Sequence, residues 1–191
     1  MRKTMTVKFK DRYRIPSNRL SGWDYAGNGH YFLTIVTHDR QPYFGYVENG
    51  EMVLSDVGRI AYDEFFKTFT LRKELRLGNF MLMPNHLHAI VTLDRLRGPN
   101  AVSPPQFLRK PQSISSFVAG FKSATIKQVD DWIDANNLAM AKFNRYNPLW
   151  QANYYDHIIR NDREYRIIFN YIQDNPLKWG DDMMYNPKRM A

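Results

Sequence analysis

The chain has 191 residues, no cysteine and a formal net charge of +8 at pH 7. The absence of cysteine excludes disulfides and thiolate metal sites, and we expect neither a transmembrane helix nor a signal peptide because no long apolar run occurs. The length predicts one domain with a sizeable core, and the basic charge favours an anionic partner, with nucleic acid ahead of a membrane surface.

The first part of the chain, residues 1–29, is predicted to be a basic N-terminal arm. It carries seven lysines and arginines against two aspartates, and it shows little periodicity. Such an arm can follow a phosphate backbone, with Arg12, Arg14 and Arg19 as candidate contacts. A solvated tail explains the same composition equally well.

Residues 31–37 are dominated by strand-forming side chains and predict the first strand of the domain. An Asn-Gly pair between two short apolar segments then predicts a β-hairpin over residues 46–54. Ser55 is expected to cap a helix that runs to about Phe69, with Gly58 weakening its first turn slightly.

A further strand is predicted over residues 86–93, which contain no glycine or proline and follow a short strand at 79–83. Because side chains alternate across a strand, His86 and His88 share one face and stand about 7 Å apart at Cα. The other face is apolar throughout and is expected to face the core: Leu87, Ala89, Val91 and Leu93.

His86 and His88 form the first candidate functional pair. Two neutral imidazoles on one rigid strand can chelate a divalent cation. Two polar histidines on a solvent-exposed face explain the same pattern, and the His-x-His spacing alone does not distinguish these possibilities.

Residues 94–112 contain four prolines and predict a basic surface loop. A helix capped by Ser113 or Ser115 follows and is expected to end at residues 136–137, with a mostly apolar face. Lys122 lies off this face and can reach a phosphate, although an ordinary solvated lysine explains its position as well.

The last predicted elements are an extended segment at residues 150–159 and a helix capped by Asn161. Glu164 at the third helical position is expected to complete a capping-box-like pair, and Pro176 ends the helix. The core-facing stripe of this helix follows the i, i+3, i+4, i+7 pattern: Tyr165, Ile168, Phe169 and Ile172.

Without the hairpin and the last helix, the predicted elements run strand, helix, strand, strand, helix, strand. This order is the split βαβ arrangement of ferredoxin-like domains. We therefore predict an α+β fold with an antiparallel sheet, helices on one face and an additional C-terminal helix. The domain is expected to span residues 30–180 and to be followed by a C-terminal tail at 181–191.

Tyr171 and Asn175 form the second candidate functional pair. On a helical wheel, Tyr171 lies about 120° from the centre of the apolar stripe, and Asn175 follows one turn later on the same side. A phenol hydroxyl and an amide oxygen therefore project together from the helix. A partly exposed tyrosine and a polar residue near the helix end explain the same pattern.

Several of these motifs occur together in one order. Met-Pro-Asn precedes the His-Leu-His motif at 86–88, and Tyr-Ile-Gln-Asp-Asn-Pro begins at Tyr171. With Trp-Gln at 150–151 and His-Ile-Ile-Arg at 157–160, the chain resembles the HUH single-tyrosine transposases, most closely the REP-associated tyrosine transposases. The similarity extends over about residues 19–180.

The resemblance implies cleavage and strand transfer of single-stranded DNA. In the family's pattern, His86 and His88 hold a divalent metal, Mg²⁺ or Mn²⁺, and Asn175 supplies a third ligand where some relatives have glutamine. Tyr171 matches the nucleophile, whose attack leaves a 5′-phosphotyrosine and a free 3′-hydroxyl. The C-terminal helix is thus expected to be a catalytic helix.

The resemblance also implies a folded single strand as substrate. Single-stranded or hairpin DNA is therefore the expected partner, in the bacterial cytoplasm and at the nucleoid, and the chain is expected to be a monomer or a homodimer. The candidate DNA contacts are basic residues: Arg12, Arg14, Arg19, Arg95, Arg97, Arg109, Lys110, Lys122 and Arg160.

Two other functions are compatible with the sequence. A non-catalytic hairpin DNA-binding protein can keep the fold, although the metal and tyrosine positions show no damage. A metal-dependent hydrolase can use metal-bound water, with Tyr171 in a structural role.

Overall fold

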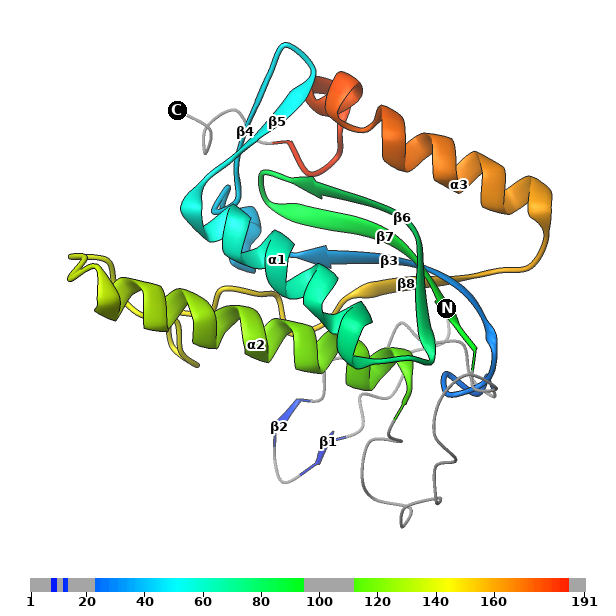
Figure 1. Cartoon of the computed structure of the whole chain (residues 1–191), viewed down its shortest axis with the longest axis horizontal. Coiled ribbons are helices and arrows are strands. Elements are labelled where there is room, and N and C mark those ends of the chain that lie inside the picture. Colours follow the sequence, from blue (N-terminus) through cyan, green and yellow to red (C-terminus); the bar gives the residue numbers. More distant parts are fainter. Residues whose placement is uncertain (1–7, 10–11, 14–22, 95–111, 186–191) are drawn as a thin grey trace.

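A four-stranded antiparallel sheet forms the centre of the molecule (Figure 1). The strands lie in the order β6-β7-β3-β8, so β7 and β3 are the two interior strands. Their bounds are Gly29–Val36 for β3, Leu75–Met83 for β6, His86–Leu93 for β7 and Tyr155–Ile159 for β8. This computed structural model describes residues 8–9, 12–13, 23–94 and 112–185.

Two helices cover one face of the sheet and a third helix covers the other (Figure 1). α1 (Asp56–Leu71) and α2 (Ile114–Ala135) pack on the main core, and α3 (Asp162–Asp174) packs over Ile90 on the opposite face. The chain order β3-α1-β6-β7-α2-β8 confirms the predicted α+β, ferredoxin-like split βαβ fold. None of the helices in the described residues is both long and apolar enough to cross a membrane.

Shorter elements flank the sheet. β4 (Gly45–Glu48) and β5 (Glu51–Leu54) form the predicted hairpin, and its Asn49 and Gly50 have φ values of 52° and 78°. Positive φ at both central residues is what a type I′ hairpin turn requires. Further short elements are β1 (Lys8–Phe9), β2 (Arg12–Tyr13), η1 (His38–Arg40) and η3 (Pro176–Asp181).

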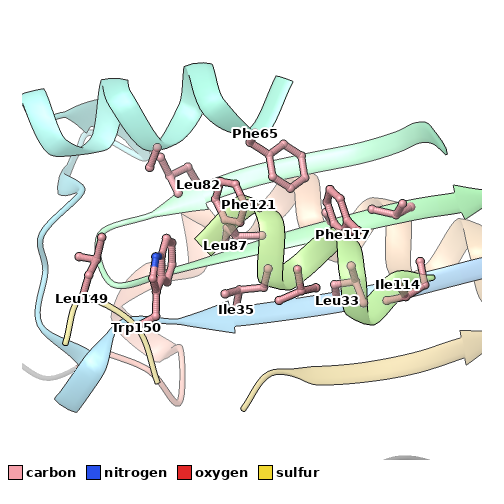
Figure 2. Packing of buried hydrophobic residues seen from close by; sticks show 14 of the residues in the cluster. Leu33, Ile35, Phe65, Leu82, Leu87, Ile114, Phe117, Phe121, Leu149 and Trp150 are labelled. Carbon is pink, nitrogen blue, oxygen red and sulfur yellow. The ribbon is translucent and has the colours of Figure 1, made fainter. Parts of the chain in front are cut away.

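The main core lies between the sheet and helices α1 and α2 (Figure 2). The ring of Phe65 in α1 stacks on Phe80 of β6, with centroids 4.3 Å apart. It also meets Phe117 and Phe121 of α2 edge to face, so aromatic packing joins the two helices to the sheet. The side chains of β7 predicted to face the core are all buried there: Leu87, Ala89, Val91 and Leu93.

A smaller core lies on the opposite face of the sheet, under α3. Ile90 of β7, Ile159 of β8 and Ile172 of α3 are buried together there. The predicted stripe of α3 therefore packs on the sheet, although Ile172 alone among the residues of α3 is fully buried. His86 and His88 lie on this covered face and are buried, so the alternative of two solvent-exposed histidines is wrong.

α3 packs on the sheet at an irregularity in β6. β6 begins at Leu75 rather than at residue 79, and its register shifts beside Gly78. This irregularity interrupts the alternating pattern of a strand, so the sequence predicts only the second half of β6. A Cβ at Gly78 would come within 2.3 Å of the Tyr165 hydroxyl of α3. Asn79 donates a hydrogen bond from Nδ2 to the carbonyl oxygen of Phe169 in α3 at 2.8 Å.

The N-terminus of α3 differs from the predicted capping-box-like pair. Asn161 accepts a hydrogen bond from the Glu164 backbone N–H at 2.9 Å, as expected. The Glu164 carboxylate instead accepts from the backbone N–H of Arg160 at 2.8 Å and lies 2.6 Å from His157 Nε2. The Glu164 side chain therefore contacts His157 and Arg160 instead of the backbone N–H of Asn161. Its contact with His157 of β8 joins α3 to the edge of the sheet.

Substitution of Gly58, in the first turn of α1, tests how closely this helix packs on the preceding loop. A Cβ at Gly58 would lie 2.1 Å from the carbonyl oxygen of Phe44. Helix propensity alone favours alanine over glycine by about 0.5–1 kcal/mol. We nevertheless expect Gly58→Ala to lower the free energy of unfolding by about 1–3 kcal/mol, because the backbone must move to admit the methyl group. Urea denaturation followed by circular dichroism measures the change.

Gly120 of α2 provides the matched control, because nothing lies within 4 Å of a Cβ built there. Gly120→Ala should raise the free energy of unfolding by about 0.5–1 kcal/mol. Stabilisation by both substitutions would contradict the close approach of α1 to Phe44.

Candidate metal centre and tyrosine site

His86 and His88 lie side by side on β7, on the face covered by α3. The pairing of β7 with β3 places His86 opposite Val36 and His88 opposite Thr34. The two histidines have 0% and 4% of their surfaces exposed, and their Nε2 atoms are 3.1 Å apart. Two nitrogens at this spacing can bind one metal ion, because neighbouring ligands about 2.1 Å from a metal lie about 3 Å apart.

Asn85, in the turn before β7, fixes the tautomer of the His86 ring. Its Nδ2 donates to the carbonyl oxygens of Arg40 at 3.2 Å and Met184 at 2.8 Å, so its Oδ1 faces His86. His86 Nδ1 lies 2.8 Å from that oxygen and therefore carries the proton. The lone pair of His86 is then on Nε2, the atom that faces His88.

His88 is held by two residues of the neighbouring strand β3. Its Nδ1 lies 2.9 Å from the Thr34 hydroxyl, and its ring stacks on Phe32 with centroids 5.3 Å apart. Thr34 Oγ1 can accept a hydrogen bond from Nδ1–H, which leaves the Nε2 lone pair available to a metal. Neither supporting residue was predicted, because cross-strand neighbours depend on the register of the sheet.

Both imidazoles are uncharged at pH 7. Burial lowers the pKa of His86 to about 3, and the Arg40 guanidinium adds to this effect. Burial also holds the pKa of His88 well below its ordinary value; His86 contributes in the same direction and the Asp182 carboxylate opposes it. Neutral imidazole is the form that binds a metal ion.

Tyr171 of α3 reaches this histidine pair. Its hydroxyl lies 3.2 Å from His88 Nε2, and its ring meets Phe32 edge to face with centroids 6.1 Å apart. The side chain keeps 44% of its surface exposed, in contrast to the buried histidines. The hydroxyl therefore lies at the boundary between the buried imidazoles and solvent.

The Tyr171 phenol is protonated at neutral pH. Burial raises its pKa above the ordinary value, and the Asp182 carboxylate adds to the rise, while a hydrogen bond with the Asn175 side chain opposes it. A phenol in this state is a weak nucleophile, so attack on a substrate requires help with removal of its proton.

Asn175 lies one turn after Tyr171, at the C-terminal end of α3, and its side chain is buried. Its Nδ2 donates to Asp182 Oδ2 at 3.3 Å. Its Oδ1 is buried and has no hydrogen-bond partner among the described residues. A buried carbonyl oxygen costs free energy unless a donor or a cation binds it, so this atom fits an oxygen ligand of a metal.

Asp182 is the residue of the site that sequence reasoning missed. Ligand atoms of His86, His88 and Asp182 all lie within 4.8 Å of one another. Asp182 belongs to the segment 181–191, which lacks periodicity and motifs and therefore predicts only a tail. Nothing in the sequence distinguishes it from Asp181 beside it.

A pocket of about 690 Å³ opens at these side chains, and its lining includes His88, Tyr171, Asn175 and Asp182. The possible donors are two imidazole nitrogens, an amide oxygen and a carboxylate. Such a set of nitrogen and oxygen donors fits Mg²⁺ or Mn²⁺, and it does not by itself exclude zinc or nickel. The residues present therefore fit a divalent metal.

The predicted DNA contacts lie on other elements. Lys122 of α2 donates from Nζ to the carbonyl oxygens of Gln151 at 2.7 Å and Asn153 at 3.1 Å, and burial lowers its pKa to about 8. Arg160 is exposed directly after β8, and Arg12 lies in β2. The remaining predicted contacts fall outside the described residues: Arg14, Arg19, Arg95, Arg97, Arg109 and Lys110.

The fold and the site define an α+β protein of the split βαβ class with a candidate metal centre facing its last helix. A protein of Haemophilus influenzae strain Rd, described as uncharacterized, is 32% identical over 189 residues, which cover 95% of this chain and 99% of the relative. The chain therefore belongs to the same protein family as this relative. No family model matches the chain.

A solved structure of a REP-associated tyrosine transposase bound to a REP hairpin has a similar fold, with a TM-score of 0.51. The two chains are 22% identical, and the match covers 80% of this chain and 68% of the transposase. The resemblance to REP-associated tyrosine transposases that the motifs indicate is thus confirmed at the level of the fold.

The metal centre predicts a specific response to Mn²⁺. Mn²⁺ should raise the thermal unfolding temperature of the wild-type protein, because a ligand that binds only the folded state stabilises it. His86→Ala and His88→Ala should each abolish this rise, since each removes a ligand nitrogen. Thermal unfolding with Mn²⁺ and with EDTA measures the effect.

His30 is the control, because it lies on β3 with its Nδ1 2.8 Å from the Thr92 hydroxyl and is not part of the histidine pair. His30→Ala should keep the full Mn²⁺ response. A response that survives in both His86→Ala and His88→Ala would refute the metal centre.

Proposed function

We propose that this chain is a metal-dependent single-stranded DNA endonuclease and strand transferase, a transposase that acts through a 5′-phosphotyrosine intermediate. The observation that carries the proposal is the Tyr171 hydroxyl 3.2 Å from His88 Nε2, next to two buried and uncharged imidazoles. The fold shared with a REP-associated tyrosine transposase supports it.

His86, His88 and Asn175 would hold the metal, Mg²⁺ or Mn²⁺. When bound, the ion neutralises and polarises the scissile phosphate, which is anionic and repels nucleophiles. Asn85 and Thr34 keep the two imidazoles oriented with Nε2 toward the site. The pocket at these side chains supplies the space for a phosphodiester.

Tyr171 is the proposed nucleophile. Its Oη forms a bond to phosphorus while the bond from phosphorus to the 3′ oxygen breaks. The phenol loses one proton and the departing 3′ oxygen gains one, so the products are a 5′-phosphotyrosine and a free 3′-hydroxyl. The ester keeps the energy of the phosphodiester, and another 3′-hydroxyl can therefore reseal it without ATP.

Hairpin-containing single-stranded DNA is the proposed substrate. The transposase of similar fold is bound to a REP hairpin, and the net charge of +8 favours a polyanion. Tyr155 lines the pocket with 51% of its surface exposed, where it can stack on an unpaired base. Arg160, Arg12 and the predicted basic residues outside the described part of the chain are the proposed phosphate contacts, whereas Lys122 already donates to two backbone carbonyls. DNA binding would place the protein at the nucleoid.

Substitution of Tyr171 tests the covalent step. Tyr171→Phe removes one oxygen from a half-exposed side chain, so the free energy of unfolding should change by about 1 kcal/mol or less. The variant should bind Mn²⁺ and hairpin DNA but form no covalent adduct with labelled single-stranded hairpin DNA on a denaturing gel. EDTA should abolish the adduct of the wild-type protein.

Tyr155 is the matched control, because it lines the same pocket and is similarly exposed. Tyr155→Phe should still form the adduct. Cleavage by Tyr171→Phe at the wild-type rate without an adduct would favour a hydrolase that uses metal-bound water. Peptide mapping of the adduct to another tyrosine would show that Tyr171 is not the nucleophile.

The form of the substrate is tested by binding. The protein should bind single-stranded hairpin DNA more tightly than a blunt duplex of the same sequence, because exposed aromatic groups at the pocket need unpaired bases. Affinity should fall steeply with salt as phosphate contacts release counterions. Fluorescence anisotropy across a salt titration measures both effects, and equal affinities for the two DNA forms at every salt concentration would rule out the preference.

A further inference from the structure

The chain turns back over the histidine pair after α3. Trp179 of η3 is buried, and the centroid of its ring lies 5.9 Å from that of His86. On its other side, Trp179 meets the ring of Tyr185 edge to face at 5.4 Å. Residues 181–185, here named the C-terminal strap, therefore lie next to the metal centre.

Hydrogen bonds from two residues in the first half of the chain hold the C-terminal strap in place. Arg40 donates from Nη1 to the carbonyl oxygen of Met183 at 2.9 Å, and Asn85 donates from Nδ2 to that of Met184 at 2.8 Å. Within the strap, the Met184 backbone N–H donates to Asp182 Oδ1 at 2.6 Å. The residue that orients the His86 ring thus also anchors the segment that carries Asp182.

Asp182 brings a negative charge to a set of candidate ligands whose other members carry none. Imidazole binds a metal ion in its neutral form, and Asn175 offers an amide oxygen without charge. A divalent cation in a buried site is unstable unless an anionic group compensates its charge. Among the described residues, Asp182 is the acidic residue that groups with the two histidines.

Asn175 and Asp182 are also joined directly. Asn175 Nδ2 donates to Asp182 Oδ2 at 3.3 Å, and this bond leaves Asn175 Oδ1 without a hydrogen-bond partner in the described part of the chain. The Asp182 carboxylate thus lies within 4.8 Å of ligand atoms of both histidines, and Asn175, with its unpaired amide oxygen, is hydrogen-bonded to that carboxylate. Hard oxygen donors of this kind are the ligands that Mg²⁺ and Mn²⁺ prefer.

We infer that Asp182 is a further protein ligand of the metal, in addition to His86, His88 and Asn175, and that metal binding fastens the C-terminal strap to the sheet. This inference rests on the proposed function only for the presence of a divalent metal at the histidine pair. It makes no use of the covalent step at Tyr171.

The test compares the Mn²⁺ affinities of two aspartate variants by isothermal titration calorimetry. Asp182→Asn removes the charge with little change in shape and should weaken Mn²⁺ binding at least tenfold. Asp181→Asn is the matched control, because Asp181 is the preceding residue and lines the same pocket but does not group with the histidines. Its affinity should stay within about twofold of the wild-type value, because losses of about tenfold or more are expected for ligands and for the groups that hold them, and Asp181 is not in the group with the histidines.

Hydrogen exchange of the wild-type protein provides an independent measurement that needs no variant to fold. Mn²⁺ should slow the exchange of backbone amides in residues 181–185, because Asp182 would then be fixed by the metal. Unchanged exchange in this segment at saturating Mn²⁺ would overturn the inference, as would an Asp182→Asn protein that binds Mn²⁺ as tightly as the wild type.

Failure of this inference can be told apart from failure of the proposed function. If Tyr171 forms no DNA adduct while Asp182→Asn weakens Mn²⁺ binding, the covalent chemistry is wrong and the ligand assignment stands. If the adduct forms at Tyr171 and Asp182→Asn leaves Mn²⁺ affinity unchanged, the ligand assignment alone is wrong.

Discussion

The site depends on the position of β7 in the interior of the sheet, where it is hydrogen-bonded to β6 on one edge and to β3 on the other. Pairing on both edges fixes the register of the strand, and the period of two then determines which side chains face which layer. His86 and His88 consequently face α3, while Leu87 and Ala89 face the main core. A slip of one residue would place the imidazoles among phenylalanines and remove the metal centre.

Burial has opposite effects on the two kinds of functional group. It keeps His86 and His88 uncharged and so leaves their nitrogen lone pairs available. It also raises the pKa of Tyr171 and makes the phenol harder to ionise, and the Asp182 carboxylate adds to that effect. A divalent cation between these groups would use the first effect and counter the second, because it would bind the uncharged imidazoles and the carboxylate and would favour the ionised phenol.

Periodicity predicted the strand at 86–93 and the apolar stripe of α3, and the order of elements predicted the fold class. These features depend on local sequence, which explains why they could be predicted. Asp182 could not, because hydrogen bonds from Arg40 and Asn85, far away in the chain, bring it to the histidines. The first half of β6 could not be predicted for a related reason: Gly78, where Tyr165 of α3 comes close to the strand, interrupts the strand pattern.

The most direct test of the metal centre is pulsed electron paramagnetic resonance of the protein loaded with Mn²⁺. Imidazole nitrogens bound to the ion give hyperfine couplings that oxygen ligands and water do not produce. The arrangement of His86 and His88, with Nε2 atoms 3.1 Å apart, predicts couplings from two nitrogens in the wild-type protein. Removal of either histidine should abolish this two-nitrogen coupling. A wild-type spectrum without nitrogen coupling would contradict the assignment of this pair as the metal centre.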